Sequence, residues 1–168
     1  IGEILLEHHQ HLGKVRTLDQ LVPELARRRS RQETIAFTNG CFDLIHAGHV
    51  ANFRFCKQQA DILVVGLNSD ASVRSLSKAD DRPIVGQADR AEVLAALADI
   101  DYVVIFDEST PQALIEAVRP DVLLKGQDWK GKSIAGQEFV EKNGGKVVLV
   151  PLVEGRSTSS LIEKIRRA

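Results

Sequence analysis

Residues 38–49 read TNGCFDLIHAGH, and this stretch decides the fold class. The short apolar run 34–38 leads into a turn that contains Gly40, and an amphipathic segment follows. A strand, a glycine-containing turn and a helix in this order are typical of phosphate-binding loops, because free backbone N–H groups at a helix start attract anions. His46 and His49 are three residues apart, so both imidazoles lie on one face of a helix start. The stretch therefore predicts a site that holds a polyphosphate.

Two other interpretations of the histidine pair are open, a half-exposed surface pair and a metal site. A metal site needs further ligands nearby, and only Cys41 and Asp43 are candidates, so phosphate is favoured over zinc. Gly48 costs about 1 kcal/mol in a helix interior, so its presence suggests that a ligand or another backbone approaches closely. We expect no metal site built from protein ligands alone.

The remainder of the chain alternates apolar runs with helical segments. Runs such as ILVVG, YVVIF and KVVLV lack in–out alternation, which is typical of strands covered on both faces, as in a parallel sheet. We predict an α/β fold with a doubly wound, Rossmann-like, five-stranded parallel sheet in the order 3-2-1-4-5. The strands are expected at 34–38, 61–67, 102–106, 122–125 and 147–151, and the helices at 50–59, 71–76, 88–98, 111–118, 137–142 and 160–167.

A helical extension is expected before the first strand, over residues 1–33, with the α/β domain over 34–168. The segment TLDQLVPELARRR places apolar residues at helical intervals, with Thr17 or Asp19 available as the cap. The apolar positions are Leu18, Leu21, Val22 and Leu25.

Composition points to a small partner. The 22 basic and 23 acidic residues give a net charge of −1, which provides no general attraction to nucleic acid or to an anionic membrane. No apolar run approaches the roughly 20 residues needed to cross a bilayer, and no secretory leader is visible, so a cytoplasmic protein is expected. Cys41 and Cys56 lack CxxC spacing, which favours free thiols in a reducing compartment.

Three motifs follow predicted strands. TNGCFD follows the first strand, KGQDW the fourth and GRSTSS the fifth. Ligands of open α/β sheets bind outside the carboxyl ends of the strands at the switch point, here between the first and fourth strands. The three motifs are therefore expected in one cleft.

TNGCFDLIHAGH resembles the signature of the nucleotidyltransferase superfamily that shares its HxGH motif with class I aminoacyl-tRNA synthetases. From about residue 34 to 167 the chain is similar to the adenylyltransferases of ADP-heptose synthesis, which act on D-glycero-β-D-manno-heptose 1-phosphate. The further motifs are GLNSD at 66–70, DRP at 81–83, LLKGQDW at 123–129 and GRSTSS at 155–160. The resemblance implies transfer of AMP from ATP to heptose 1-phosphate, which yields ADP-heptose and pyrophosphate for lipopolysaccharide inner-core synthesis.

Two alternatives to the adenylyltransferase function remain open. Cytidylyltransferases of glycerol- or ethanolamine-type phosphates share the HxGH loop, but 98–102 read ADIDY where they have an RYVD-like segment, and TNGCFD replaces their GTFD form. A non-catalytic nucleotide-binding regulator is the other alternative, although the histidines and the closing hydroxyl motif are both intact.

Site roles follow from the chemistry and the resemblance. Nucleotidyl transfer needs positioning and neutralisation of negative charge, with no protein nucleophile. The catalytic candidates are His46, His49, Lys78 and Arg90. Nucleotide-binding candidates are Thr38, Asn39, Gly40, Cys41, Phe42, Asp43, Gly48, Lys125, Gly126, Ser157, Thr158 and Ser159. Substrate-binding candidates are Asp43, Arg82, Asp128 and Trp129.

Several of these residues have a structural alternative. Lys78 could be a solvent-exposed lysine, and Arg90 could form an ion pair with Asp81 or Asp89. Trp129 could be a core residue, and residues 157–159 could cap the last helix. Phe42 is expected to be a packing anchor whose amide, and not its ring, meets phosphate.

Mg²⁺ is expected to arrive with ATP and to be held largely by triphosphate oxygens and water. The partners implied are ATP and a sugar 1-phosphate. A homodimer or higher homo-oligomer is expected, with a separate heptose kinase in the same pathway because 168 residues leave no room for one.

Overall fold

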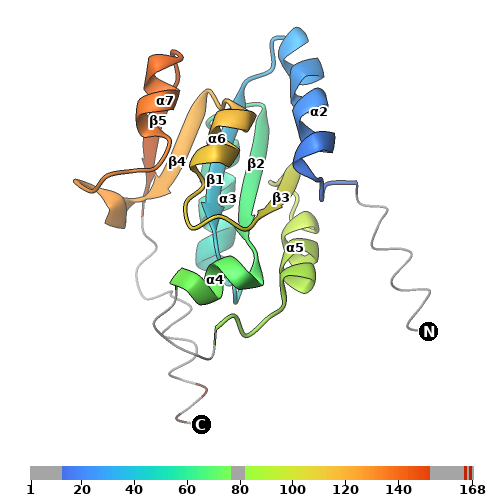
Figure 1. Ribbon diagram of the computed structural model, residues 1–168, viewed down its shortest axis with the longest axis vertical. Coiled ribbons are helices and arrows are strands. Elements are labelled where there is room, and N and C mark those ends of the chain that lie inside the picture. The colour runs from blue at the N-terminus through green and yellow to red at the C-terminus, as the bar shows by residue number, and fades with distance from the viewer. Residues whose placement is uncertain (1–12, 77–81, 152–164, 166, 168) are drawn as a thin grey trace.

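The computed structural model describes residues 13–76, 82–151, 165 and 167 (Figure 1). In chain order its elements are α2 Leu18–Ser30, β1 Ile35–Gly40, α3 Ala47–Lys57, β2 Ile62–Asn68, α4 Asp70–Leu76, α5 Gln87–Ala95, β3 Tyr102–Phe106, α6 Gln112–Val118, β4 Val122–Gly126, the 3-10 turn η2 Gln127–Trp129, α7 Gln137–Lys142 and β5 Lys146–Val150.

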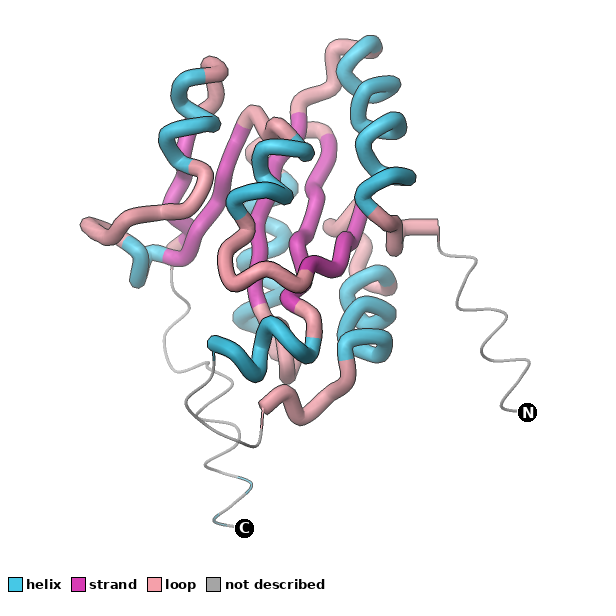
Figure 2. The backbone as a smooth tube through the Cα atoms, in the orientation of Figure 1, coloured by secondary structure: helices cyan, strands magenta, loops and turns pink. Residues whose placement is uncertain are grey.

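The five strands form one sheet in the order β3-β2-β1-β4-β5. Every neighbouring pair is parallel, and the strands run side by side through the middle of the molecule (Figure 2). The predicted topology is confirmed, and the switch point lies between β1 and β4.

Helices cover both faces of the sheet, and each face has its own core. Phe37 and Val64 pack with α2, α6 and α7 on one face, whereas Ala36 and Leu63 pack with α3 and α5 on the other. Figure 1 shows α6 in front of the sheet and α3 behind it. Successive residues of a strand point to opposite faces, so continuous apolar runs are what two buried faces require.

The helix before β1 shares this core. Thr17, rather than Asp19, caps α2, because its side chain accepts from the backbone N–H of Gln20. Leu21 and Leu25 are fully buried against α6 and β3, but Leu18 and Val22 are exposed, so only half of the expected apolar stripe meets the core. The segment expected as an extension therefore contributes to the α/β core.

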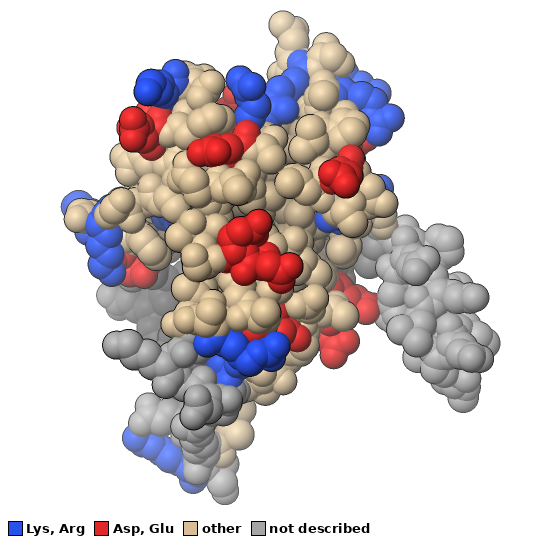
Figure 3. Space-filling model, viewed as in Figure 1, with Lys and Arg blue, Asp and Glu red and all other residues tan. Residues whose placement is uncertain are grey.

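The described surface carries charges of both signs, and the two cysteines are not paired with each other. Both acidic and basic side chains occur in small groups on the face shown in Figure 3, and neither sign covers it. Cys41 and Cys56 are free thiols. Over the described ranges, none of the helices combines the length and apolarity that crossing a membrane requires.

Candidate active site

The phosphate loop, residues 41–46, joins β1 to α3 at the carboxyl end of the central strand. α3 begins at Ala47, three residues before the expected start at 50, because His46 acts as its N-cap. The His46 Nδ1 atom accepts from the backbone N–H of Gly48 at 3.1 Å, and the His49 Nδ1 atom accepts from the backbone N–H of His46 at 3.4 Å. The ring centroids are 3.9 Å apart, so the two imidazoles lie together as their spacing predicts.

These hydrogen bonds determine the tautomer of each neutral ring. A neutral imidazole has one N–H donor and one acceptor nitrogen. Because each Nδ1 atom accepts a backbone N–H, each neutral ring carries its proton on Nε2. The helix cap therefore turns both histidines into Nε2–H donors, which is the form that hydrogen bonding to a phosphate oxygen requires.

His49 is neutral at physiological pH. Burial, and secondly the neighbouring His46, lowers the pKa of His49 from 6.5 to about 4. The ring therefore contributes a hydrogen-bond donor, not a fixed positive charge, before a nucleotide arrives.

An NMR titration of the ring protons is expected to give a His49 pKa of about 4 in the nucleotide-free protein. Saturating Mg-ATP is expected to raise this pKa, since nearby negative charge favours the imidazolium form. The folded-state pKa of His49 lies below the ordinary value of 6.5. Its contribution to the free energy of unfolding is therefore fully present above pH 6.5 and is lost as pH falls towards 4.

The control for this titration is His46→Asn, which removes the electrostatic effect of His46 on the His49 pKa and leaves the effect of burial. It is expected to raise the His49 pKa only part of the way to 6.5. A titration curve of His49 that is identical with and without saturating nucleotide would contradict its contact with phosphate.

A cavity of about 500 Å³ opens beside the carboxyl ends of β1 and β4. It brings together residues that the sequence assigned to one cleft from segments more than eighty residues apart. From the predicted site it contains Thr38, Asn39, Gly40, Cys41, Lys125, Gly126 and Trp129. It also contains Asn68, Leu76, Ser109, Thr110, Pro111, Ser133 and Ala135, none of which was predicted.

Lys125 provides a buried cation in this cavity. The residue is 7% exposed, its ammonium donates to Asn39 Oδ1, and burial lowers its pKa to about 8 despite the opposing charge of Asp128. The ammonium lies 5.3 Å from the ring centre of Trp129. A buried amine of this kind can bind a phosphate group.

Trp129 lies on η2 and is 38% exposed, so the alternative that it belongs to the core is wrong. Its ring contributes to the cavity lining, and Lys132 approaches the ring at 5.8 Å. An exposed aromatic face beside a polar cavity can stack on a ligand. Asp128 is exposed and does not line the cavity.

The imidazole pair does not line this cavity, and neither do Phe42 and Asp43, although Cys41 at the start of the phosphate loop does. The Phe42 ring packs against His49 and Phe53, with ring centroids 5.6 and 5.1 Å away, as expected of a packing anchor. Phe42 has a left-handed backbone with φ of 46°, which lets the chain turn sharply between β1 and α3. Gly48 is buried in the first turn of α3.

Arg82, Arg90 and Asp43 lie together but are bonded to protein groups. Arg82 pairs with Asp43 at 3.1 Å. Arg90 is 1% exposed and forms an ion pair with Asp70 at 2.7 Å, whereas the sequence had offered Asp81 or Asp89 as its partner. In this arrangement Arg90 does not line the cavity, because its guanidinium is enclosed by backbone carbonyls.

Four candidates, Lys78 and residues 157–159, lie outside the described residues, as does Asp81. Their assigned roles stay predictions. Across 13–76, 82–151, 165 and 167, no group of three or more His, Cys, Asp or Glu side chains could hold a metal ion.

Three of the missed cavity residues, Asn68, Ser109 and Thr110, lie at or after the carboxyl end of a strand. Asn68 belongs to the GLNSD motif, yet no role was assigned to it, whereas Ser109 and Thr110 belong to no motif. Asn68 ends β2, and Ser109 and Thr110 follow β3, so the rule that ligands bind at the carboxyl ends of strands could have found all three.

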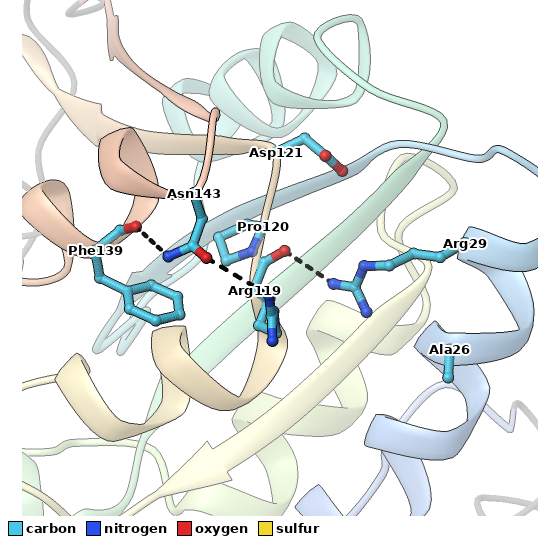
Figure 4. Close-up of a pocket in the computed structure, with 7 residues that line it drawn as sticks. All are labelled: Ala26, Arg29, Arg119, Pro120, Asp121, Phe139 and Asn143. Carbon is cyan, nitrogen blue, oxygen red and sulfur yellow. Dashed lines mark hydrogen bonds between the residues drawn. The ribbon is translucent and has the colours of Figure 1, made fainter.

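A second cavity, of about 470 Å³, lies at the opposite end of β4 beside α2 and α7 (Figure 4). Several polar groups that line this cavity form hydrogen bonds with one another. Arg29 donates to the Arg119 carbonyl at 2.8 Å, Arg119 reaches Asn143 Oδ1 at 3.5 Å, and Asn143 donates to the Phe139 carbonyl at 2.8 Å. Arg29 also donates to the Val118 carbonyl and so completes the end of α6, which indicates a structural role.

Fold and site together define the class of protein: a nucleotidyltransferase, with a phosphate loop, a pair of imidazole donors and a buried lysine at the switch point of a parallel sheet. Residues 37–164 match the family model described as cytidylyltransferase-like, and the chain belongs to this family.

Similar proteins agree with this assignment. The chain is 49% identical to "Bifunctional protein HldE" of Geobacter metallireducens over 168 residues, which is all of this chain and 34% of that protein. It is 54% identical to the protein of the same name from Koribacter versatilis over 152 residues, 90% of this chain and 31% of that protein. The chain thus spans about one third of the length of these curated relatives.

A solved structure shows the same fold. The lipopolysaccharide core biosynthesis protein from Thermoplasma volcanium superposes with a TM-score of 0.61 at 25% identity, over 74% of this chain and 99% of that protein.

Proposed function

We propose that this chain transfers AMP from ATP to a heptose 1-phosphate, releasing pyrophosphate and forming ADP-heptose for lipopolysaccharide inner-core synthesis. The observation that carries the proposal is the paired Nε2–H imidazoles on the phosphate loop next to a cavity with a buried lysine. The names of the HldE relatives and of the core biosynthesis protein support the choice of pathway.

The reaction needs alignment and charge neutralisation more than proton transfer. The acceptor phosphate is ionised near neutral pH and attacks the α-phosphorus, and pyrophosphate leaves in line. His46 and His49 donate to the α-phosphate and to the adjoining bridging oxygen, while backbone N–H groups of residues 40–42 bind the triphosphate. No side chain is asked to act as a nucleophile.

The cavity supplies complementary groups for the acceptor. Lys125 contributes a cation to its lining, and Asn68, Ser109 and Thr110 contribute uncharged amide and hydroxyl groups. A cation for the phosphate and neutral polar groups for hydroxyls suit a sugar phosphate.

Mg²⁺ fits this scheme as an ion that arrives with the triphosphate. The described residues offer no carboxylate cluster to hold it, so the triphosphate oxygens and water would be its main ligands. When bound, it would neutralise phosphate charge.

The acceptor and nucleotide are tested in one screen. The protein is incubated with Mg²⁺ and either ATP or CTP, together with the β or α anomer of heptose 1-phosphate, glycerol 3-phosphate or ethanolamine phosphate, and released pyrophosphate is measured. We expect turnover with ATP and the β anomer. Turnover with CTP and glycerol or ethanolamine phosphate would establish the cytidylyltransferase alternative. Tight ATP binding without turnover on any acceptor would establish a regulator.

The acceptor itself must come from a kinase reaction that places phosphate on the anomeric hydroxyl. We propose that this activity precedes the transferase in the same pathway. We also propose that the protein works as a homodimer or larger homo-oligomer, which light scattering on the purified protein tests.

A further inference from the structure

Asp43 connects the phosphate loop to a segment forty residues further along the chain. The residue is 4% exposed, and its carboxylate accepts from the backbone N–H groups of Ile84 and Val85, each at 2.9 Å. Arg82 Nη1 donates to the same carboxylate at 3.1 Å. All of these donors come from the segment before α5, so one buried carboxylate holds that segment against the loop.

Arg90 joins the same two segments from the other side. From α5, its Nε atom donates to the Val85 carbonyl at 2.9 Å, and Nη1 donates to the Cys41 carbonyl at 2.5 Å and the Asn68 carbonyl at 2.9 Å. Nη2 donates to Asp70 Oδ1 at 2.7 Å. One guanidinium therefore ties the phosphate loop to the end of β2, the start of α4 and the segment before α5.

These contacts leave Arg90 few N–H donors that could bind a ligand. A guanidinium has five N–H donors, and the four hydrogen bonds above use four of them inside the protein. Its side chain is 1% exposed. A phosphate could reach it only if this buried network opened, which would leave several carbonyl groups without donors.

We propose that Asp43, Arg82 and Arg90 form a positioning clamp: they hold the phosphate loop in the geometry that nucleotidyl transfer requires, and they do not bind substrate. The inference rests on the proposed function. The clamp contacts both sides of Phe42, through the Cys41 carbonyl and the Asp43 side chain, and α3 with its two histidines follows directly. Misplacing a reacting group by about 1 Å can cost on the order of 100-fold in rate, so loosening this loop lowers kcat.

Arg82→Gln is the most direct test of the clamp. The Arg82 side chain is 22% exposed, and its replacement leaves intact the two hydrogen bonds that Asp43 accepts from the backbone N–H groups of Ile84 and Val85. We expect kcat to fall about 10-fold, with the KM values for ATP and sugar phosphate changed less than about twofold, since a positioning defect affects the transition state alone. A rise of tenfold or more in either KM, or an unchanged kcat, would overturn the clamp.

Asp43→Asn and Arg90→Lys remove more of the clamp. Lysine cannot reproduce the planar fork that reaches four acceptors, and asparagine places an NH2 group where Asp43 Oδ2 accepts from Arg82 and Ile84. Each variant is therefore expected to lower kcat by about 100-fold at nearly constant KM. Combined, the two changes are expected to cost less than the product of the single effects, because they act on the same loop. Fully multiplicative effects would show that the two residues act separately. If Arg90→Lys does not fold, the Arg82 and Asp43 variants decide the question.

The matched control is Arg54→Gln. Arg54 also pairs with an aspartate, Asp99, at 3.9 Å, but on the exposed side of α3. Its kinetics are expected to equal those of the wild type. Wild-type protein that turns over no acceptor would refute the proposed function and the clamp together, whereas active wild type with a KM effect in Arg82→Gln refutes the clamp alone.

Discussion

His49→Ala is expected to lower kcat by about 10²- to 10³-fold while the protein stays folded, which is the usual cost of losing one preorganised donor at a transition state. The ring is held by the His46 backbone N–H and by the edge of Phe42, so its Nε2–H direction is set before the nucleotide binds. Such a donor costs no reorganisation during the reaction. Alanine removes the donor and one helix-cap contact, and the cap itself is worth about 1 kcal/mol.

Steady-state kinetics and a thermal melt measure the two parts of this expectation. A small shift in the melting temperature together with a large loss of kcat separates catalysis from folding. His9→Ala, at a histidine to which we assign no role, is the matched control and is expected to behave as wild type. A rate for His49→Ala within a few-fold of wild type would refute the role of the imidazole pair.

Lys125→Met is expected to lower kcat/KM by about 10- to 100-fold, since hydrogen bonds to charged groups are worth about 1.5–3 kcal/mol. Methionine keeps an unbranched apolar chain of similar length but removes the ammonium, and Asn39 Oδ1 loses its donor. Among the described residues that line the cavity, no cation then remains to meet the phosphate.

The pH dependence provides an independent check on Lys125. Because burial lowers its pKa to about 8, the free protein loses this positive charge as pH rises through 8, and phosphate binding weakens there. The methionine variant is expected to lack this step. Lys132→Met, at the exposed lysine on the other side of Trp129, is the control and is expected to change kcat/KM less than about threefold. Equal effects at the two positions would contradict a special role for the buried amine.

The zinc interpretation of the histidine pair loses its basis in the local geometry. Both Nδ1 atoms accept backbone N–H groups, and each neutral ring therefore carries its proton on Nε2, so in this arrangement neither ring nitrogen offers a free electron pair to a metal. Asp43, one of the two further ligands considered, is occupied by Arg82 and two backbone amides.

The sequence by itself determined the fold class and two parts of the site, the histidine pair and Lys125. Strands that are apolar at every position can be stable only between two covered faces, and this local pattern predicts a doubly wound parallel sheet. The spacing of His46 and His49 determines their shared face, because helix geometry is the same in every protein. Lys125 lies near the carboxyl end of β4, so the topology places it at the switch point.

Only the tertiary structure decided which charged residues are available to a ligand. Arg90 and Asp43 were both candidates for the ligand site, yet Arg90 is bonded to four protein acceptors, and Asp43 to Arg82 and two backbone amides. Ser109 and Thr110, which carry no motif, lie in the cavity. The physical reason is that burial and hydrogen-bond partners come from segments distant in the chain, and local periodicity contains no record of which backbone carbonyl a given guanidinium will meet.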